Sequence, residues 1–262
     1  MNKRLQDKTI LIIGGTSGLG LSAARACIAE GASVVVTGRN ADKCELAQVQ
    51  LGDKGLTLQA DAMNREATES IFQETVRKFG ELNGLYHVAG GSGRRMGDGP
   101  LHDISDEGWQ YTLDLNLTSL FYSNRAAVRQ FREQGSGGSV LNMTSVLADS
   151  PSPEHFATHT YAATKAGAVG LTKACAAYYA KDSIRFNAIA PSLFETPLAQ
   201  RAVTDDAIMR YVRSKQPLDG GRAGQPSDTD DAVVFFLSDA SKFVTGQVLA
   251  VDGGWSVTDG QI

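Results

Sequence analysis

A tyrosine and a lysine four residues apart, Tyr161 and Lys165, are the residues of this sequence whose types and spacing most directly indicate chemistry. Positions i and i+4 lie on one face of a helix, so the phenol and the ammonium can face one cavity. A phenol has a reference pKa of about 10, and a nearby cation favours its ionised form. The YxxxK spacing is common by chance, so its meaning depends on a nearby hydroxyl and on a nucleotide-binding turn elsewhere.

The hydroxyl partner could come from any of three serines in TSVLADSPSPEHFATHT, the stretch that runs up to the tyrosine. Ser145 ends an apolar run that predicts a strand, and a strand end is a rigid mount for a functional side chain. Ser150 and Ser152 lie beside prolines in a predicted irregular loop, so we expect them to be turn residues. His155 and His159 have HxxxH spacing without a third evident ligand, so we expect no metal, although either could line a substrate cavity.

A strand, a glycine turn and a helix are predicted for TILIIGGTSGLGLSAARACIAEG near the start of the chain. Gly14, Gly18 and Gly20 have the spacing GxxxGxG, which differs from the more general GxGxxG fingerprint. Glycine permits unusual backbone dihedrals and a close approach of a ligand. The start of the following helix offers free N–H groups to a pyrophosphate. The segment predicts a dinucleotide site, with the alternative that the glycines serve the turn alone.

The end of the second predicted strand, VVVTGRN, decides the choice of dinucleotide. An acidic residue there would bind the ribose 2′-hydroxyl, but this sequence has Gly38 and Arg39. Arg39 can pair with a 2′-phosphate, and the sequence shows no acidic neighbour that would repel that group; the alternative is a solvated surface arginine. NADP(H) is therefore favoured, with NAD(H) possible. Asp61, after the third strand, is expected to bind the adenine or else to cap the helix predicted from Asn64.

Short β-rich runs alternate with longer helical patterns along the whole chain. This alternation predicts an α/β fold: a single doubly wound, Rossmann-like domain over 1–262, with a parallel sheet of about seven strands and helices on both faces. A substrate lid is expected over 194–219. The predicted strands are 9–14, 33–38, 56–60, 82–90, 139–145, 183–191 and 247–253, and the predicted helices are 18–30, 64–79, 106–134 and 161–181.

In this order the motifs resemble the classical branch of the short-chain dehydrogenase/reductase family over essentially the whole chain. The resemblance is carried by GGTSGLG (14–20), AG (89–90), LDLNLTS (113–119), TSV (144–146), YAATK (161–165), NAIAPSLFETP (187–197) and VTGQVLAVDGGW (244–255). No single one of these motifs is specific, but the ordered set is.

The resemblance implies a catalytic tetrad of Asn116, Ser145, Tyr161 and Lys165. Tyr161 would donate a proton to a carbonyl oxygen or accept one from an alcohol, and Ser145 would hydrogen-bond the same oxygen. Lys165 would lower the pKa of Tyr161 and bind the nicotinamide ribose, and Asn116 would hold a relay water. The implied dinucleotide-binding residues are Gly14, Ser17, Gly18, Leu19, Gly20, Arg39, Asp61, Ala62, Ala89, Gly90, Tyr161, Lys165, Phe194 and Thr196.

Three departures from the family pattern are visible. His87–Val88 replaces an asparagine pair, and we expect His87 to be a satisfied core histidine. Pro191–Ser192 replaces a Pro-Gly pair, without loss of the contacts expected from Phe194 and Thr196. The gap between Ser145 and Tyr161 is a few residues longer than usual, so we expect SPSPEHFATH to contain an insertion that bulges outward.

The resemblance implies an oxidoreductase that interconverts a secondary alcohol and a ketone by hydride transfer from or to a nicotinamide cofactor. One alternative is a non-catalytic dinucleotide-binding sensor or scaffold, against which the intact tetrad argues. Another is a nucleotide-sugar epimerase or dehydratase, for which the chain leaves little room after VDGGW. Arg94 and Arg95, in the loop after the fourth strand, could grip an anionic group of the substrate or form a solvated surface pair.

Composition and charge give no case for a nucleic-acid or membrane partner, and the resemblance implies a small-molecule carbonyl or alcohol substrate. A formal net charge of −4 gives no basic footprint for nucleic acid. The longest apolar run, 232–237, falls far short of the roughly 18 residues that suggest a membrane span. Three widely spaced cysteines are expected to be reduced thiols of a cytoplasmic protein. The resemblance implies a homotetramer, with 106–134 and 161–181 in its larger interface.

Overall fold

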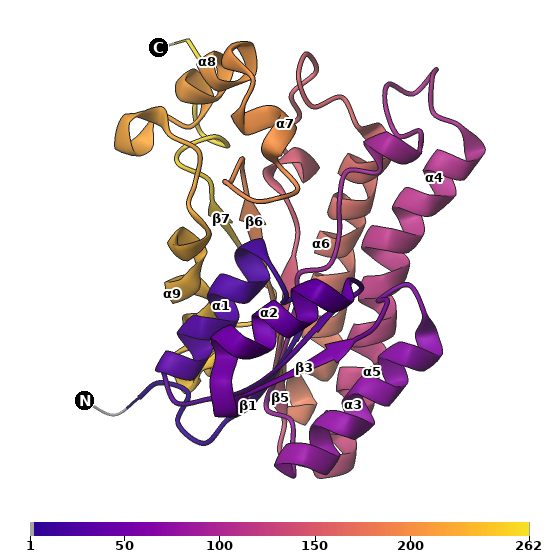
Figure 1. Cartoon of the computed structure of the whole chain (residues 1–262), viewed down its shortest axis with the longest axis vertical. Helices are drawn as coiled ribbons and strands as arrows, with labels where there is room; N and C mark the ends of the chain where they lie inside the picture. Colours follow the sequence, from indigo (N-terminus) through magenta and orange to yellow (C-terminus); the bar gives the residue numbers. More distant parts are fainter. Residues whose placement is uncertain (1–2, 262) are drawn as a thin grey trace.

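Seven strands within the described part of the chain pair in parallel, in the order β3-β2-β1-β4-β5-β6-β7 (Figure 1). The computed structural model describes residues 3–261, so residues 1, 2 and 262 of the predicted domain lie outside it. The parallel doubly wound sheet that the sequence predicts is confirmed. The strands are β1 (Thr9–Ile13), β2 (Ser33–Gly38), β3 (Gly55–Gln59), β4 (Gly84–His87), β5 (Gly138–Met143), β6 (Ile184–Pro191) and β7 (Val248–Val251).

The inner strands are apolar along their length because helices cover both faces of the sheet. All five residues of β1 and the four middle residues of β2 are buried. Such continuous Val- and Ile-rich runs are typical of parallel strands. β1 pairs with both β2 and β4, so the direction of the strand order reverses at β1. In open α/β sheets ligands bind at this reversal, beyond the carboxyl ends of the strands.

Helices form two layers around the sheet. α1, α2 and α9 cover one face, and α3, α5 and α6 cover the other (Figure 1). The helices are α1 (Gly18–Ala29), α2 (Ala41–Leu51), α3 (Arg65–Phe79), α4 (Asp106–Leu113), α5 (Ser119–Gln134), α6 (His159–Tyr179), α7 (Gln200–Val203), α8 (Asp206–Lys215) and α9 (Asp230–Leu237). No helix among residues 3–261 is long and apolar enough to cross a membrane.

The stretch 106–134, predicted as one helix, is interrupted by a π turn at Asp114–Thr118. The backbone N–H of Ser119 donates to the carbonyl of Asp114, five residues earlier. The turn places Asn116 where its side chain meets the loop after β4. Hydrophobic periodicity does not reveal such an insertion, because the insertion shifts the pattern of apolar positions by only one residue. π turns of this kind are frequent at functional sites.

A third, smaller apolar cluster lies beyond the carboxyl ends of β5, β6 and β7. Val146, Leu193, Ile208, Val212 and Trp255 are buried in it. This cluster anchors α7 and α8, which lie at the top of Figure 1. The segment 194–219, expected to be a lid, therefore has its own packed support instead of lying loose on the surface.

The loop between β5 and α6 packs inward in part, whereas Pro151, Pro153 and Glu154 within it are exposed. The Phe156 ring lies 5.8 Å from the Trp255 ring, and Trp255 Nε1 donates a hydrogen bond of 3.3 Å to the carbonyl of Ser150. Ser152 is buried. The prolines do make the loop irregular, but burial of its aromatic side chain holds it against the third cluster.

Candidate active site

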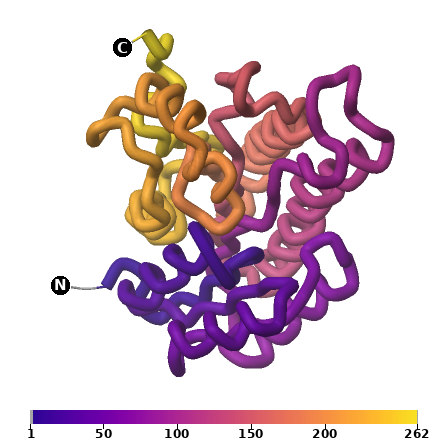
Figure 2. The backbone as a smooth tube through the Cα atoms, turned by 45° about the horizontal axis from the view of Figure 1, so that its top comes forward, coloured from indigo at the N-terminus to yellow at the C-terminus, as the bar shows by residue number. Residues whose placement is uncertain are grey.

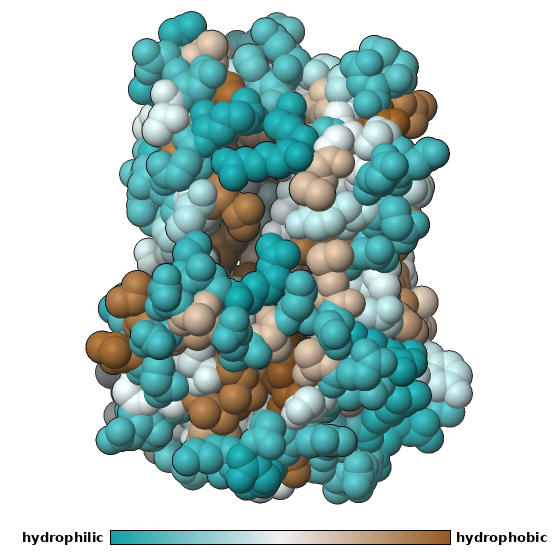
Figure 3. Space-filling model, turned by 45° about the vertical axis from the view of Figure 1, so that its right-hand side comes forward, coloured by the Kyte–Doolittle hydropathy of each residue, from teal (hydrophilic) through white to brown (hydrophobic). Residues whose placement is uncertain are grey.

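A cleft of about 820 Å³ opens at the carboxyl ends of the strands. Its walls come from the glycine turn, the loop 90–96, the end of β5, the first turns of α6, and the segment 191–202. Figure 2 shows the loop after β4 and the α7–α8 segment on opposite sides of this end of the molecule. Figure 3 shows a hollow whose visible wall is apolar and whose rim is largely hydrophilic.

Three of the four predicted catalytic residues line this cleft together: Ser145, Tyr161 and Lys165. Ser145 lies two residues after the end of β5, and its Oγ accepts a hydrogen bond of 3.2 Å from the backbone N–H of Leu147. The Ser145 hydroxyl is close enough to the phenol of Tyr161 to lower the pKa of that phenol. Ser145 is therefore the serine that serves the tyrosine, because it stands at a strand end that faces α6.

Neither predicted loop histidine lines the cleft. The His155 ring packs 5.1 Å from the ring of Tyr211. The Nδ1 atom of His159 accepts a hydrogen bond of 3.0 Å from the backbone N–H of Leu101. Both histidines therefore fasten the walls of the cleft. Phe156, between them in the chain, is the residue of this loop that contributes an aromatic wall.

Burial governs the protonation of Tyr161 and Lys165. Lys165 is 2% exposed, its Nζ donates a hydrogen bond of 3.0 Å to the carbonyl of Met143, and burial lowers its pKa to about 8. Burial raises the pKa of Tyr161, and the Ser145 hydroxyl only partly opposes this rise. Lys165 Nζ lies 5.5 Å from the centre of the Tyr161 ring. The phenol is therefore protonated at neutral pH, and these side chains by themselves do not produce the lowered pKa that was expected.

Asn116 fastens the loop after β4 to the π turn. Its Nδ2 donates to the carbonyls of Gly91 and Thr112, both at 2.9 Å, and its Oδ1 accepts from the N–H of Gly91 at 3.0 Å. Gly90 beside it must be glycine, since a Cβ there would lie 2.6 Å from Asn116 Oδ1 and 3.2 Å from Lys165 Nζ. The amide is thus engaged with backbone, and the water-relay role of Asn116 stays a prediction.

Asp98 is a functional residue that the sequence did not single out. It is 4% exposed, and its two carboxylate oxygens accept hydrogen bonds from the backbone N–H groups of Thr160 (3.1 Å) and Tyr161 (2.9 Å). Thr158, the residue at the N-cap of α6, makes no side-chain cap bond. Asp98 supplies the missing cap from a distant loop. Because such a contact is long-range, no local pattern could have found it.

The glycine turn fits the pyrophosphate of a dinucleotide. Gly14 and Gly18 have φ of 92° and 53°, which side chains rarely adopt. A Cβ on Gly20 would lie 2.3 Å from the carbonyl oxygen of Gly14, so the first turn of α1 packs directly on the loop. Ser17 makes no side-chain cap bond at the start of α1. The N–H groups of that turn can therefore receive an anion.

The predicted dinucleotide residues divide into two groups. One group lines the cleft and the other does not. In the second group the glycines shape the turn, and Gly14 packs on Ala89. The lining group is Ser17, Leu19, Arg39, Gly90, Tyr161, Lys165, Phe194 and Thr196, and the second group is Gly14, Gly18, Gly20, Asp61, Ala62 and Ala89.

The structure places an acidic residue beside Arg39, where the sequence predicted none. Its Nη1 lies 3.9 Å from Asp61 Oδ2, because pairing of β2 with β3 brings the ends of both strands together. Lys43, one helical turn further on, lines the cleft with Arg39 and was not predicted. Asp61 bonds the backbone N–H of Met63 at 2.9 Å, while the N-cap of α3 is Asn64. The alternative of Asp61 as the helix cap is therefore wrong.

His87 is the satisfied core histidine that the sequence predicts. It is fully buried, and its Nδ1 lies 2.8 Å from Ser123 Oγ in a hydrogen bond. Its Nε2 lies 3.5 Å from Ser119 Oγ. Burial, aided by the charge of Lys165, lowers the pKa of His87 to about 3. The ring is thus neutral at physiological pH and joins β4 to α5.

Comparison with known proteins agrees with this geometry. Residues 14–256 match the family model described as enoyl-(acyl carrier protein) reductase. The chain is 34% identical to 2,5-dichloro-2,5-cyclohexadiene-1,4-diol dehydrogenase of Sphingobium indicum, over 96% of this chain and 98% of that protein. It is 30% identical to cis-4-hydroxycyclohexanecarboxylate dehydrogenase of Sinomonas cyclohexanicum, over 98% and 99%. A solved short-chain type dehydrogenase/reductase from Mycobacterium ulcerans superposes with a TM-score of 0.89, at 32% identity, over 97% of this chain and 91% of that one.

Proposed function

The chain belongs to the short-chain dehydrogenase/reductase family, and we propose that it interconverts a secondary alcohol and a ketone with Tyr161 as the general acid and base. The observation that carries the proposal is that Ser145, Tyr161 and the buried Lys165 line one cleft together. A nicotinamide dinucleotide, when bound, supplies or accepts the hydride.

Tyr161, Ser145 and Lys165 each have a separate role in the reaction at the substrate oxygen. In reduction, the protonated phenol of Tyr161 donates its proton to the carbonyl oxygen, and the hydroxyl of Ser145 hydrogen-bonds that oxygen as negative charge develops. Lys165, as an ammonium below a pKa of about 8, stabilises the phenolate that remains. In oxidation, the same phenolate accepts the proton of the alcohol. Asn116 holds the loop that borders Lys165.

For the cofactor we propose NADP(H) over NAD(H). Arg39 and Lys43 both line the cleft where the ribose 2′-phosphate of NADP would lie, and guanidinium and ammonium groups both bind phosphate. Asp61 opposes this preference, because its carboxylate is 3.9 Å from Arg39 and would repel the phosphate. Two cations against one exposed anion favour NADP(H), while NAD(H) stays possible.

We further propose that 194–219 acts as a lid, that the chain forms a homotetramer, and that it works in the cytoplasm. Phe194, Thr196 and Leu198 line the cleft, which supports the lid. Large apolar side chains exposed on α4 and α5, Trp109 and Phe121, support an interface there. The free cysteines Cys27, Cys44 and Cys175 support a reducing compartment.

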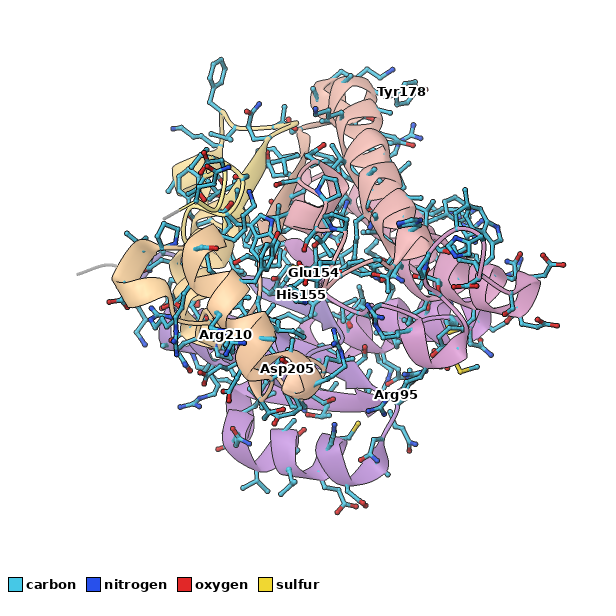
Figure 4. The ribbon with its side chains drawn as sticks, turned by 90° about the horizontal axis from the view of Figure 1, so that it is seen from above. Arg95, Glu154, His155, Tyr178, Asp205 and Arg210 are labelled. Atoms are coloured by element: carbon cyan, nitrogen blue, oxygen red, sulfur yellow. The ribbon has the colours of Figure 1, made fainter. Side chains whose placement is uncertain are left out.

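Nicotinamide absorbance during turnover of a panel of secondary alcohols and ketones tests the proposed reaction. Tyr161→Phe should lower kcat by about a hundredfold or more while cofactor binding is retained. Tyr178→Phe is the matched control, since Tyr178 is on the same helix, 62% exposed, at the end remote from the cleft (Figure 4). Undiminished turnover by Tyr161→Phe would overturn the assignment. Tight cofactor binding without any turnover would favour the sensor alternative.

A further inference from the structure

Three arginines line the mouth of the cleft from both sides. Arg94 and Arg95 lie on the loop after β4, and Arg201 lies on α7. In Figure 4, Arg95 lies apart from Asp205, the N-cap of α8, and from Arg210 within α8. Two segments more than a hundred residues apart in the sequence thus present guanidinium groups to one opening.

Arg94 and Arg201 are close enough to repel each other. Partial burial and the charge of Arg201 both lower the pKa of Arg94. Within residues 3–261, no ion pair includes Arg94, Arg95 or Arg201. The one side-chain hydrogen bond described for them runs from Arg201 Nη2 to the carbonyl of His155 at 3.4 Å. Repulsion between unpaired cations is relieved when an anion binds between them.

Two carboxylates whose charges act on Arg94 and Arg201 accept hydrogen bonds from backbone. Asp98, the acid that acts on Arg94, accepts the N–H groups at the start of α6. Asp205, which lies near Arg201, accepts the N–H groups of Ala207 (2.9 Å) and Ile208 (3.1 Å) at the start of α8. Among the described residues, no aspartate or glutamate lines the cleft. Asp98 and Asp205 still act on the arginines through their charge, but neither forms an ion pair with them or lines the cleft, so an anionic ligand can reach the guanidinium groups.

The loop that carries Arg94 is tied to the helix that carries Tyr161. Asp98 ties the loop of Arg94 to the backbone of Tyr161, and the N–H of His159 donates to the carbonyl of Gly99 at 3.1 Å. The wall of the cleft that holds the arginines and Tyr161 is largely apolar. The apolar lining includes Met96, Leu115, Val146, Phe156, Leu193, Leu198 and Trp255. This arrangement fits a molecule with an apolar body and an anionic end.

We propose that the substrate is a secondary alcohol or ketone that carries an anionic oxygen group, a carboxylate or a phosphate, away from its reacting carbon, and that Arg94 and Arg201 bind this group. Guanidinium groups bind both kinds of anion through paired charge-assisted hydrogen bonds. Arg95 adds positive charge at the rim. The inference rests on the proposed alcohol–ketone activity and specifies the substrate class of the same cleft.

Matched substrate series test the proposal. Each series holds a hydroxy acid, its methyl ester and the corresponding hydroxyalkyl phosphate, built on cyclohexanol, aromatic and linear secondary-alcohol bodies. We expect kcat/KM to favour an anionic member over the ester by about tenfold or more. Whether the acid or the phosphate is preferred identifies the anion. High salt should reduce the preference because it screens the exposed arginines.

Arginine variants test which residues bind the anionic group of the substrate. Arg94→Gln and Arg201→Gln should each raise KM for the anionic member by about 10- to 100-fold and leave the ester unchanged. Arg210→Gln, on the lid but outside the cleft lining, is the matched control and should change neither. Ester turnover equal to that of the acid and the phosphate would overturn this inference alone. Absence of turnover for every member of every series would instead defeat the proposed activity.

Discussion

The carboxylate of Asp98 accepts a 2.9 Å hydrogen bond from the backbone N–H of Tyr161, and its second oxygen bonds the preceding amide. The loop that follows β4 therefore holds the first turn of the helix that carries the phenol and Lys165. The loop that forms part of the cleft wall is thus connected to the helix that carries Tyr161. A substitution in the loop should therefore alter the position of the reacting hydroxyl.

Removal of the Asp98 carboxylate should slow catalysis. Asp98→Ala leaves two buried amides without their acceptor, which should cost about 1–3 kcal/mol of unfolding free energy. We expect kcat to fall by roughly tenfold or more, as misplacement of a reacting group is costly. Asp98→Asn keeps one acceptor and should fall between. Asp103→Ala, at an exposed position nearby, is the control; steady-state kinetics showing equal kcat in Asp98→Ala and Asp103→Ala would contradict the positioning role.

Cofactor preference should depend on the cations beside β2. Arg39→Ala and Lys43→Ala should each lower kcat/KM for NADP(H) by about tenfold and leave that for NAD(H) nearly unchanged, since only the 2′-phosphate contact is lost. Asp61→Asn should act in the opposite sense, because it removes the negative charge that competes for Arg39. Lys54→Ala, at an exposed position outside the cleft lining, serves as the control. An unchanged cofactor ratio in all variants would refute the NADP(H) preference.

Stability should fall in acid because burial opposes protonation of His87 in the folded chain. Its pKa is lowered to about 3 by burial, while an unfolded histidine titrates at about 6.5. Below pH 6.5 the unfolded state binds a proton that the native state does not, so this group lowers the unfolding free energy as pH falls towards 3. Between pH 7.5 and 5 the loss should be about 2 kcal/mol.

Urea unfolding of a His87 variant isolates this contribution. His87→Asn or His87→Gln should flatten the dependence of the unfolding free energy on pH over that window, whatever the variant costs at pH 7.5. His102→Asn is the control, because the His102 side chain is 81% exposed. Parent-like pH dependence in both His87 variants would mean that other groups carry the effect.

Two glycines near the catalytic residues should respond oppositely to alanine. At Gly90 the new methyl would lie 2.6 Å from Asn116 Oδ1 and 3.2 Å from Lys165 Nζ, so Gly90→Ala should displace both and reduce kcat by roughly tenfold or more. Gly170 is exposed on α6 with open space around it, so Gly170→Ala should raise the unfolding free energy by about 0.5–1 kcal/mol with activity retained. Thermal unfolding of both variants measures the change in stability, and steady-state kinetics measure the change in kcat.

The sequence by itself determined the sheet, the glycine turn and the pairing of Tyr161 with Lys165. Each is a local property: continuous apolar runs predict buried parallel strands, and spacing along a helix places two side chains on one face. Ser145 could be chosen over Ser150 and Ser152 for the same reason, since a strand end is recognisable from its own residues.

Only the tertiary structure decided which distant residues meet. The contact of Arg39 with Asp61 depends on β2 pairing with β3, and that of Asp98 with Tyr161 depends on how a loop folds back on α6. The approach of Arg94 to Arg201 likewise needs both walls of the cleft in place. Periodicity and turn chemistry act over a few residues, whereas these contacts join segments whose separation is set by the order of strands in the sheet.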